Sequence, residues 1–204
     1  MKYLWLPLLL ALILLLPRYK GTQPDPLLDA DAKILAFGDS LTFGYGAKPQ
    51  ESSPATLAQL THHPITNAGV SGEVSQDGLR RLRKLLNHTD AKLLLLCHGG
   101  NDILRKYSKK ALQENIHTMV QLAKQKGMQV LLIGVPDLSF LGLETLPLYT
   151  EIAQEESIVY MPHLLENILS TAALKSDMIH PNAKGYKKMA EAIYAKLKEE
   201  NILE

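Results

Sequence analysis

The chain has little cysteine and no excess of charge. Cys97 is the only cysteine in 204 residues, so no disulfide can form within the chain. The 22 Lys and Arg residues nearly balance the 21 Asp and Glu residues, which leaves a formal net charge of +1. This balance gives no electrostatic reason to expect a nucleic-acid partner. The short basic runs at residues 80–84 and 109–110 are interpreted as solvated helix faces.

Motifs for metals and cofactors are also missing. The seven histidines show no H-E-x-x-H pattern or other ligand spacing. There is no phosphate loop, and Gly44-x-Gly46 lacks the third glycine of a dinucleotide fingerprint. The sequence therefore predicts neither a metal nor a cofactor. His98, just before a Gly-Gly-Asn block, is interpreted as lining a cleft, with a satisfied buried histidine as the alternative.

Residues 36–46 read A-F-G-D-S-L-T-F-G-Y-G and follow a short apolar run. A Gly-Asp-Ser turn at the end of a strand presents the Ser40 hydroxyl in a cleft, and glycine lets a substrate carbonyl approach the backbone. A serine in this position is a candidate nucleophile, provided that a base and an oxyanion site accompany it.

A candidate base lies near the C-terminus, where residues 176–182 read S-D-M-I-H-P-N. The spacing of Asp177 and His180 in a loop can bring the carboxylate onto one ring nitrogen. The other nitrogen is then free to take the Ser40 proton. Taken alone, so short a pattern more often marks a turn and a surface histidine.

Two glycine-containing segments follow apolar runs and supply candidate oxyanion donors. The N–H of Gly69, the side-chain amide of Asn101 and the N–H of Ser40 make three donors for a developing oxyanion. Ordinary turn chemistry for the glycine and a helix N-cap role for the asparagine are the alternatives.

In this order, Ser40, Gly69, Asn101 and the Asp177–His180 pair resemble the four blocks of the SGNH (GDSL) hydrolases. Within the family, the segment N-A-G-V-S-G-E-V-S-Q-D-G-L-R-R-L looks like the bacterial branch that contains thioesterase I/protease I/lysophospholipase L1 and related arylesterases.

The resemblance implies a three-layer α/β/α fold around a flavodoxin-like, five-stranded parallel sheet. It implies Ser40 as nucleophile, His180 as base and Asp177 as its orienting partner, with Ser40, Gly69 and Asn101 as oxyanion donors. The implied activity is that of a serine esterase, which hydrolyses carboxylic esters or thioesters through an acyl-enzyme on Ser40. Glu73 departs from the family pattern, where Asp is more usual.

Along the rest of the chain, short apolar runs alternate with segments whose apolar residues recur at helical spacing. The pattern predicts a helix capped by Ser75, and alternation of this kind predicts a parallel sheet with right-handed crossovers. Ligands bind at the carboxyl ends of the strands in such sheets. Strands are predicted at residues 33–37, 65–68, 92–97, 129–135 and 158–161, and helices at 53–60, from 75, 108–126 and 182–200.

Residues 4–16 are almost purely apolar and have basic residues on both flanks. The pattern is typical of a signal peptide or an N-terminal membrane anchor within residues 1–20, and both stay open. Residues 21–31 are predicted to be a linker, and residues 32–204 the hydrolase domain. We expect a periplasmic or other extracytoplasmic location, with residues 1–17 as an inner-membrane anchor if they are retained. The sequence does not predict an oligomeric state.

The segment 135–149 is unusually apolar for a loop. Its side chains either pack on the core, as a short helix, or line an acyl groove beside the nucleophile; those concerned are Leu138, Phe140, Leu141, Leu143 and, for the core, Leu146. A groove favours a small-molecule or lipid ester, such as a lysophospholipid, a fatty acyl thioester or an aryl ester. Two further alternatives are a carbohydrate or cell-wall O-acetyl esterase and a membrane-tethered, non-catalytic binding module.

Overall fold

A computed structural model describes residues 27–137 and 143–204. The predicted signal or anchor and most of the predicted linker lie outside these residues, as do Leu138, Phe140 and Leu141. Within the described ranges, no helix combines the length and the hydropathy needed to cross a bilayer.

Five parallel strands form one sheet in the order β2-β1-β3-β4-β5, which is the flavodoxin-like order. This confirms the predicted fold. The order reverses between β1 and β3, and open α/β sheets bind ligands at such a switch point. The strands are β1 (Ile34–Gly38), β2 (Ile65–Gly69), β3 (Leu93–Cys97), β4 (Gln129–Ile133) and β5 (Val159–Met161).

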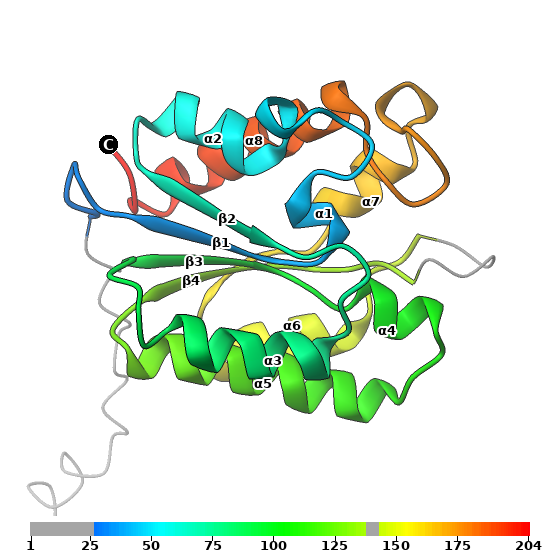
Figure 1. Cartoon of the computed structure of the whole chain (residues 1–204), viewed down its shortest axis with the longest axis horizontal. Coiled ribbons are helices and arrows are strands. Elements are labelled where there is room, and N and C mark those ends of the chain that lie inside the picture. Colours follow the sequence, from blue (N-terminus) through cyan, green and yellow to red (C-terminus); the bar gives the residue numbers. More distant parts are fainter. Residues whose placement is uncertain (1–26, 138–142) are drawn as a thin grey trace, which may run out of the picture.

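Helices cover both faces of the sheet, as Figure 1 shows. One face carries α2 (Ser53–Thr61), α7 (Leu164–Leu169) and α8 (Ala183–Glu199), and the other carries α3 (Ser75–Leu85), α5 (Lys109–Gln125) and α6 (Pro147–Glu156). Two short helices, α1 (Ser40–Phe43) and α4 (Gly100–Leu104), begin just beyond the carboxyl ends of β1 and β3. The remaining elements are the 3₁₀ turns η2 (Pro49–Glu51) and η3 (Ala172–Leu174).

The central strands explain why the sequence takes this arrangement. Every residue of β1 and β3 is buried, as expected for parallel strands that are covered on both faces. Cys97 is part of this core, as predicted, and is a free thiol. Helix α8 faces the sheet with one apolar stripe at helical spacing, which consists of Tyr186, Met189, Ile193 and Leu197.

One local prediction needs correction. Val74, not Ser75, is the N-cap of α3, because the Ser75 hydroxyl and N–H donate instead to the buried carboxylate of Asp102 at 2.7 and 2.8 Å. This contact ties the start of α3 to α4. Helix α6 begins inside the segment 135–149, with a proline in its first turn, which agrees with the alternative of a short helix packed on the core, whereas α7 was not predicted.

The packing of β3 generates a stability prediction. Replacing Leu96, which is fully buried, with alanine should lower the free energy of unfolding by about 2–5 kcal/mol, because it leaves a cavity in a close-packed core. The exposed Leu27 is the matched control, and Leu27→Ala should change stability by no more than about 0.5 kcal/mol. Urea titration of both variants measures the difference, and equal losses would contradict the proposed core.

Candidate active site

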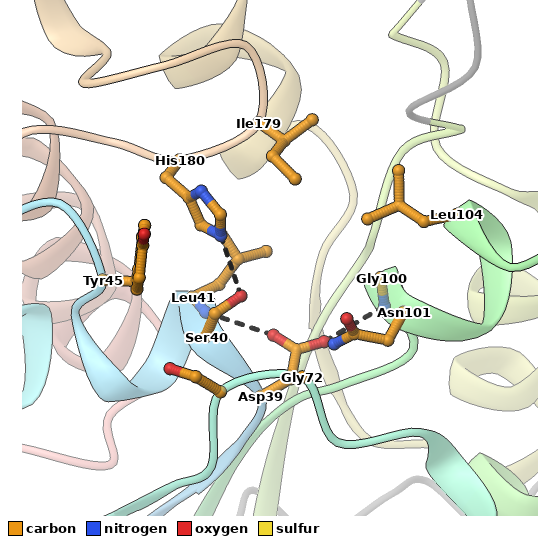
Figure 2. Close-up of a pocket in the computed structure, with 11 residues that line it drawn as sticks. Asp39, Ser40, Leu41, Tyr45, Gly72, Gly100, Asn101, Leu104, Ile179 and His180 are labelled. Atoms are coloured by element: carbon orange, nitrogen blue, oxygen red, sulfur yellow. Dashed lines mark hydrogen bonds between the residues drawn. The ribbon is translucent and has the colours of Figure 1, made fainter.

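A chain of hydrogen bonds joins three of the predicted residues. Ser40 begins α1 just beyond β1, and its Oγ lies 3.0 Å from Nε2 of His180. A dashed line marks this hydrogen bond in Figure 2. Nδ1 of the same ring lies 2.8 Å from Oδ2 of Asp177. The loop before α8 therefore brings the acid and the imidazole to a serine that lies 140 positions earlier in the chain.

The surroundings of Asp177 keep its carboxylate ionised. Partial burial acts to raise the pKa of Asp177, but hydrogen bonds from the Ile179 N–H and from His180 outweigh it and lower the pKa overall. Its Oδ1 accepts both backbone N–H groups, at 2.9 and 2.8 Å. Because an ionised carboxylate only accepts hydrogen bonds, Nδ1 of His180 carries the hydrogen and Nε2 can accept the Ser40 proton. The Tyr45 ring packs against the imidazole, with 4.6 Å between ring centroids.

Asp39 connects the serine turn to the next turn of the site. Its side chain is almost fully buried, where Oδ1 accepts the Leu41 N–H and Oδ2 accepts the Gly100 N–H, both at 3.1 Å. Burial raises the pKa of Asp39. These two hydrogen bonds fix the distance between the start of α1 and the start of α4. They thereby also fix the positions of Ser40 and Asn101 relative to each other.

A pocket of about 210 Å³ opens beside Ser40 at the carboxyl edge of the sheet. It lies at the switch point between β1 and β3, where the fold predicts a ligand site. Its lining consists of Asp39, Ser40, Leu41, Tyr45, Ser71, Gly72, Gly100, Asn101, Leu104, Ile179 and His180, most of which are labelled in Figure 2.

The structure does not bring Gly69 to this pocket. Its N–H donates to Oδ1 of Asn67 at 3.0 Å, and a Cβ at this position would lie 2.1 Å from the Phe43 nitrogen. Gly69 is therefore needed for the close packing of α1 on β2, and the prediction that it is an oxyanion donor is corrected.

Gly72 lies at the pocket position that was predicted for Gly69. It lines the pocket at a φ of 80°, a backbone conformation that favours glycine. Among the described residues, its N–H has no hydrogen-bond partner. The sequence offers Gly72 as a second candidate for this position, because both glycines occur in the same short segment N-A-G-V-S-G.

Asn101 lies in the pocket as predicted. Its Nδ2 donates to the backbone oxygen of Glu73 at 3.0 Å. A side-chain amide carries two N–H donors, so this bond fixes the orientation of the amide and leaves a second donor for a ligand. Figure 2 shows Asn101 on the Ser40 side of α4, beside Asp39.

Other predicted site residues lie elsewhere. His98 is fully buried and does not line the pocket, which corrects its interpretation as a cleft residue. Leu143 is half-buried against the core and not a pocket wall, because the chain there runs into α6. Arg81 is not on a fully solvated helix face, since it pairs with Glu73 at 2.6 Å.

The apolar walls of the pocket were missed by sequence reasoning. Leu41, Tyr45, Leu104 and Ile179 come from three separate segments, and nothing in their spacing predicts that they meet. In the part of the chain that the structure describes, no three His, Cys, Asp or Glu side chains are grouped as metal ligands.

Comparison with known proteins agrees with this geometry. The model of the GDSL-like Lipase/Acylhydrolase family matches residues 36–188. The chain belongs to this family. It is 29% identical over 178 residues to an arylesterase of Vibrio mimicus, covering 82% of this chain and 89% of that protein. It is also 29% identical over 175 residues to esterase TesA of Pseudomonas aeruginosa, covering 81% and 87%.

Solved structures show the same relationship. The esterase EstA from Pseudoalteromonas sp., in a structure inhibited by monoethylphosphonate, has a TM-score of 0.73 with 26% identity, covering 83% of this chain and 98% of that one. The family and the fold together confirm the prediction of a GDSL-type serine hydrolase of carboxylic esters.

The hydrogen-bond chain predicts the effect of two substitutions. Ser40→Ala should abolish ester hydrolysis. Asp177→Asn should lower kcat by about 10⁴-fold, because the amide favours the wrong imidazole tautomer. Both variants should keep the wild-type circular dichroism spectrum. Steady-state kinetics with a p-nitrophenyl ester measure the losses, and full activity in folded Ser40→Ala would refute the assignment.

The lowered pKa of Asp177 makes a prediction for acid stability. Its ordinary pKa is 3.8 and the folded value lies below this, so the ionised group stabilises the fold above about pH 4, and this contribution is lost as the pH falls through the folded pKa. The stability difference between wild type and Asp177→Asn should therefore shrink between about pH 5 and pH 2. Ser40→Ala, which keeps Asp177, should follow the wild-type curve.

Proposed function

We propose that Ser40 is the nucleophile of this esterase and that His180 is its base. In the first step, Oγ forms a bond to the acyl carbon while its proton moves to Nε2 of His180. Nε2 then donates this proton to the leaving oxygen or sulfur as the bond to the acyl carbon breaks. Asp177 holds the ring and stabilises the imidazolium. The observation that carries the proposal is the continuous chain from Asp177 through His180 to Ser40, facing a pocket.

The second step uses the same groups in reverse. Water loses a proton to Nε2 of His180 and attacks the acyl carbon. The bond to Oγ breaks, the proton returns to Ser40, and the carboxylic acid leaves. The step needs no cofactor, since every proton that is taken up is given back.

Three donors stabilise the charged intermediate in this account. They are the N–H groups of Ser40 and Gly72 and the free amide hydrogen of Asn101. These groups come from different loops around one pocket and are held in place before the reaction, which is the condition for a large electrostatic contribution.

The pocket supports a substrate with an apolar acyl chain. Leu41, Leu104 and Ile179 form apolar walls, while the volume of about 210 Å³ is smaller than that of sites for drug-sized ligands. We therefore propose that the pocket holds the first carbons of the acyl group of an ester or thioester. These apolar walls favour an acyl chain over an acetylated sugar.

Exposed apolar side chains near the pocket extend this argument to lipid esters. Apart from Leu27, the large apolar side chains that are exposed in the described residues come from segments at the carboxyl edge: Phe43, Tyr45, Val70, Leu104, Tyr107 and Met178. Clustered exposed apolar groups are typical of surfaces that contact a ligand or a lipid. Such a surface suits a substrate whose hydrocarbon chain continues beyond the pocket.

The chain-length preference tests the proposed substrate. With p-nitrophenyl esters from acetyl to palmitoyl, kcat/KM should peak at about four to ten carbons, because the pocket is apolar but small. Leu104→Ser should shift the peak toward acetyl, whereas Leu27→Ser, at an exposed site far from the pocket, should not move it. A maximum at acetyl in the wild type would contradict the apolar pocket and favour an acetyl esterase.

We propose that the domain works outside the cytoplasm, close to a membrane. The support is the apolar segment at residues 4–16 with basic flanks. Fused to a reporter enzyme that is active only after export, residues 1–32 should give reporter activity in a bacterial host. A fusion with Leu8 and Leu9 changed to arginine should not. Equal reporter activity in both fusions would refute export through this segment.

A further inference from the structure

A buried polar cluster lies behind the loop that carries Gly72. Glu73 is its centre, since the carboxylate accepts two hydrogen bonds from the Arg81 guanidinium at 2.8 and 2.6 Å and contacts Nε2 of His98 at 3.1 Å. The Glu73 side chain is 8% exposed and that of His98 is 0% exposed. The Arg81 guanidinium also lies 4.1 Å from the centre of the Phe37 ring. The cluster thus links α3 to β1 and to the end of β3.

The role of His98 follows from its single side-chain hydrogen bond. The pKa of Glu73 is lowered to about 2: burial acts to raise it, but Arg81 and His98 outweigh this. Because the ionised carboxylate only accepts hydrogen bonds, Nε2 of His98 is the donor. Nδ1 has no partner within the described residues. Burying a polar ring with one unpaired nitrogen costs more free energy than burying an apolar side chain. What His98 provides and an apolar side chain could not is the hydrogen bond to Glu73.

The backbone of Glu73 connects this cluster to the reacting groups. Its carbonyl oxygen accepts the Asn101 amide at 3.0 Å, and its nitrogen belongs to the peptide that follows Gly72. Any rotation of this segment would therefore move two of the three proposed oxyanion donors together. His98 stands three positions before Asn101, so its bond to Glu73 joins the two loops that carry these donors.

We propose that Glu73, Arg81 and His98 form a positioning cluster for the oxyanion site, in which His98 locks the Gly72–Glu73 loop onto the end of β3. The cluster touches neither substrate nor Ser40, and its effect passes through Gly72 and Asn101. This inference rests on the proposed function, because it assumes that these two residues bind the oxyanion.

Gly78 offers a test in which no member of the cluster is itself substituted. A Cβ at this position would lie 2.3 Å from Nε2 of His98 and 3.2 Å from Oε2 of Glu73, so Gly78→Ala should force the pair apart. Alanine is a better helix former than glycine, so the substitution does not lower the intrinsic helix propensity of α3. Gln76→Ala, on the exposed side of the same helix, is the control.

Substitutions of His98 test the same contact directly. His98→Leu fills the buried site with an apolar side chain of similar size and removes the donor, and His98→Gln offers an amide N–H near the Nε2 position. In the full-length protein, His98→Leu and Gly78→Ala should each lower kcat by about 10–100-fold, as expected for misplaced transition-state groups, with KM changed less than about twofold. His98→Gln should recover most of the loss, and Gln76→Ala should match the wild type.

A second readout separates positioning from a general loss of structure. Titration of Ser40 with a reactive phosphonate gives the fraction of active enzyme, to which kcat is normalised. An alkyl boronic acid, which forms a tetrahedral anion on serine, should bind more weakly to His98→Leu by the same factor as the fall in kcat. If normalised kcat and boronate affinity stay within twofold of wild type in both His98→Leu and Gly78→Ala, the cluster is only structural. If Ser40→Ala retains activity, the proposed function fails instead.

Discussion

The rest of the site depends on the hydrogen bonds that the buried carboxylate of Asp39 accepts from two neighbouring turns. The parallel strands β1 and β3 end side by side, but this alone does not set the distance between the turns that follow them. Asp39 does so by accepting the N–H of Leu41 from one turn and the N–H of Gly100 from the other. Because an unpaired buried carboxylate would be very costly, both turns are held where these bonds can form. Ser40 and Asn101 then face one pocket.

The sheet, the strand positions and the residues Ser40, Asn101, Asp177 and His180 could be predicted from the sequence, since they depend on local patterns. Fully apolar runs such as Leu93–Cys97 have few structural alternatives. The pair Asp177 and His180 lies within one loop, so its short spacing already favours the observed contact. Gly69 was mistaken for an oxyanion donor because two glycines stand three positions apart. Only their three-dimensional surroundings show that one packs under α1 and that the other faces the pocket.

Long-range contacts account for what the sequence could not reveal. The pocket walls Leu41, Leu104 and Ile179 meet only after the sheet has formed, and no periodicity marks them. Arg81 lies in a basic run that resembles a solvated helix face, yet it reaches inward to Glu73. His98 was predicted to line a cleft because it precedes a Gly-Gly-Asn block, but its side chain is fully buried. The pocket walls and the partner of His98 lie in distant segments, so a local pattern carries no information about them. Arg81 lies only eight positions from Glu73, but the basic run around it gives no sign of the inward contact.

In the proposed reaction, the chain cleaves esters through a covalent acyl group on Ser40. The most direct measurement is mass spectrometry of the protein quenched in acid shortly after mixing with a p-nitrophenyl ester, followed by digestion. We expect the mass of one acyl group on the peptide that contains Ser40, and no such adduct in Ser40→Ala. Two results would contradict this mechanism: an acyl group on a residue other than Ser40 in the active wild type, or equal turnover by Ser40→Ala.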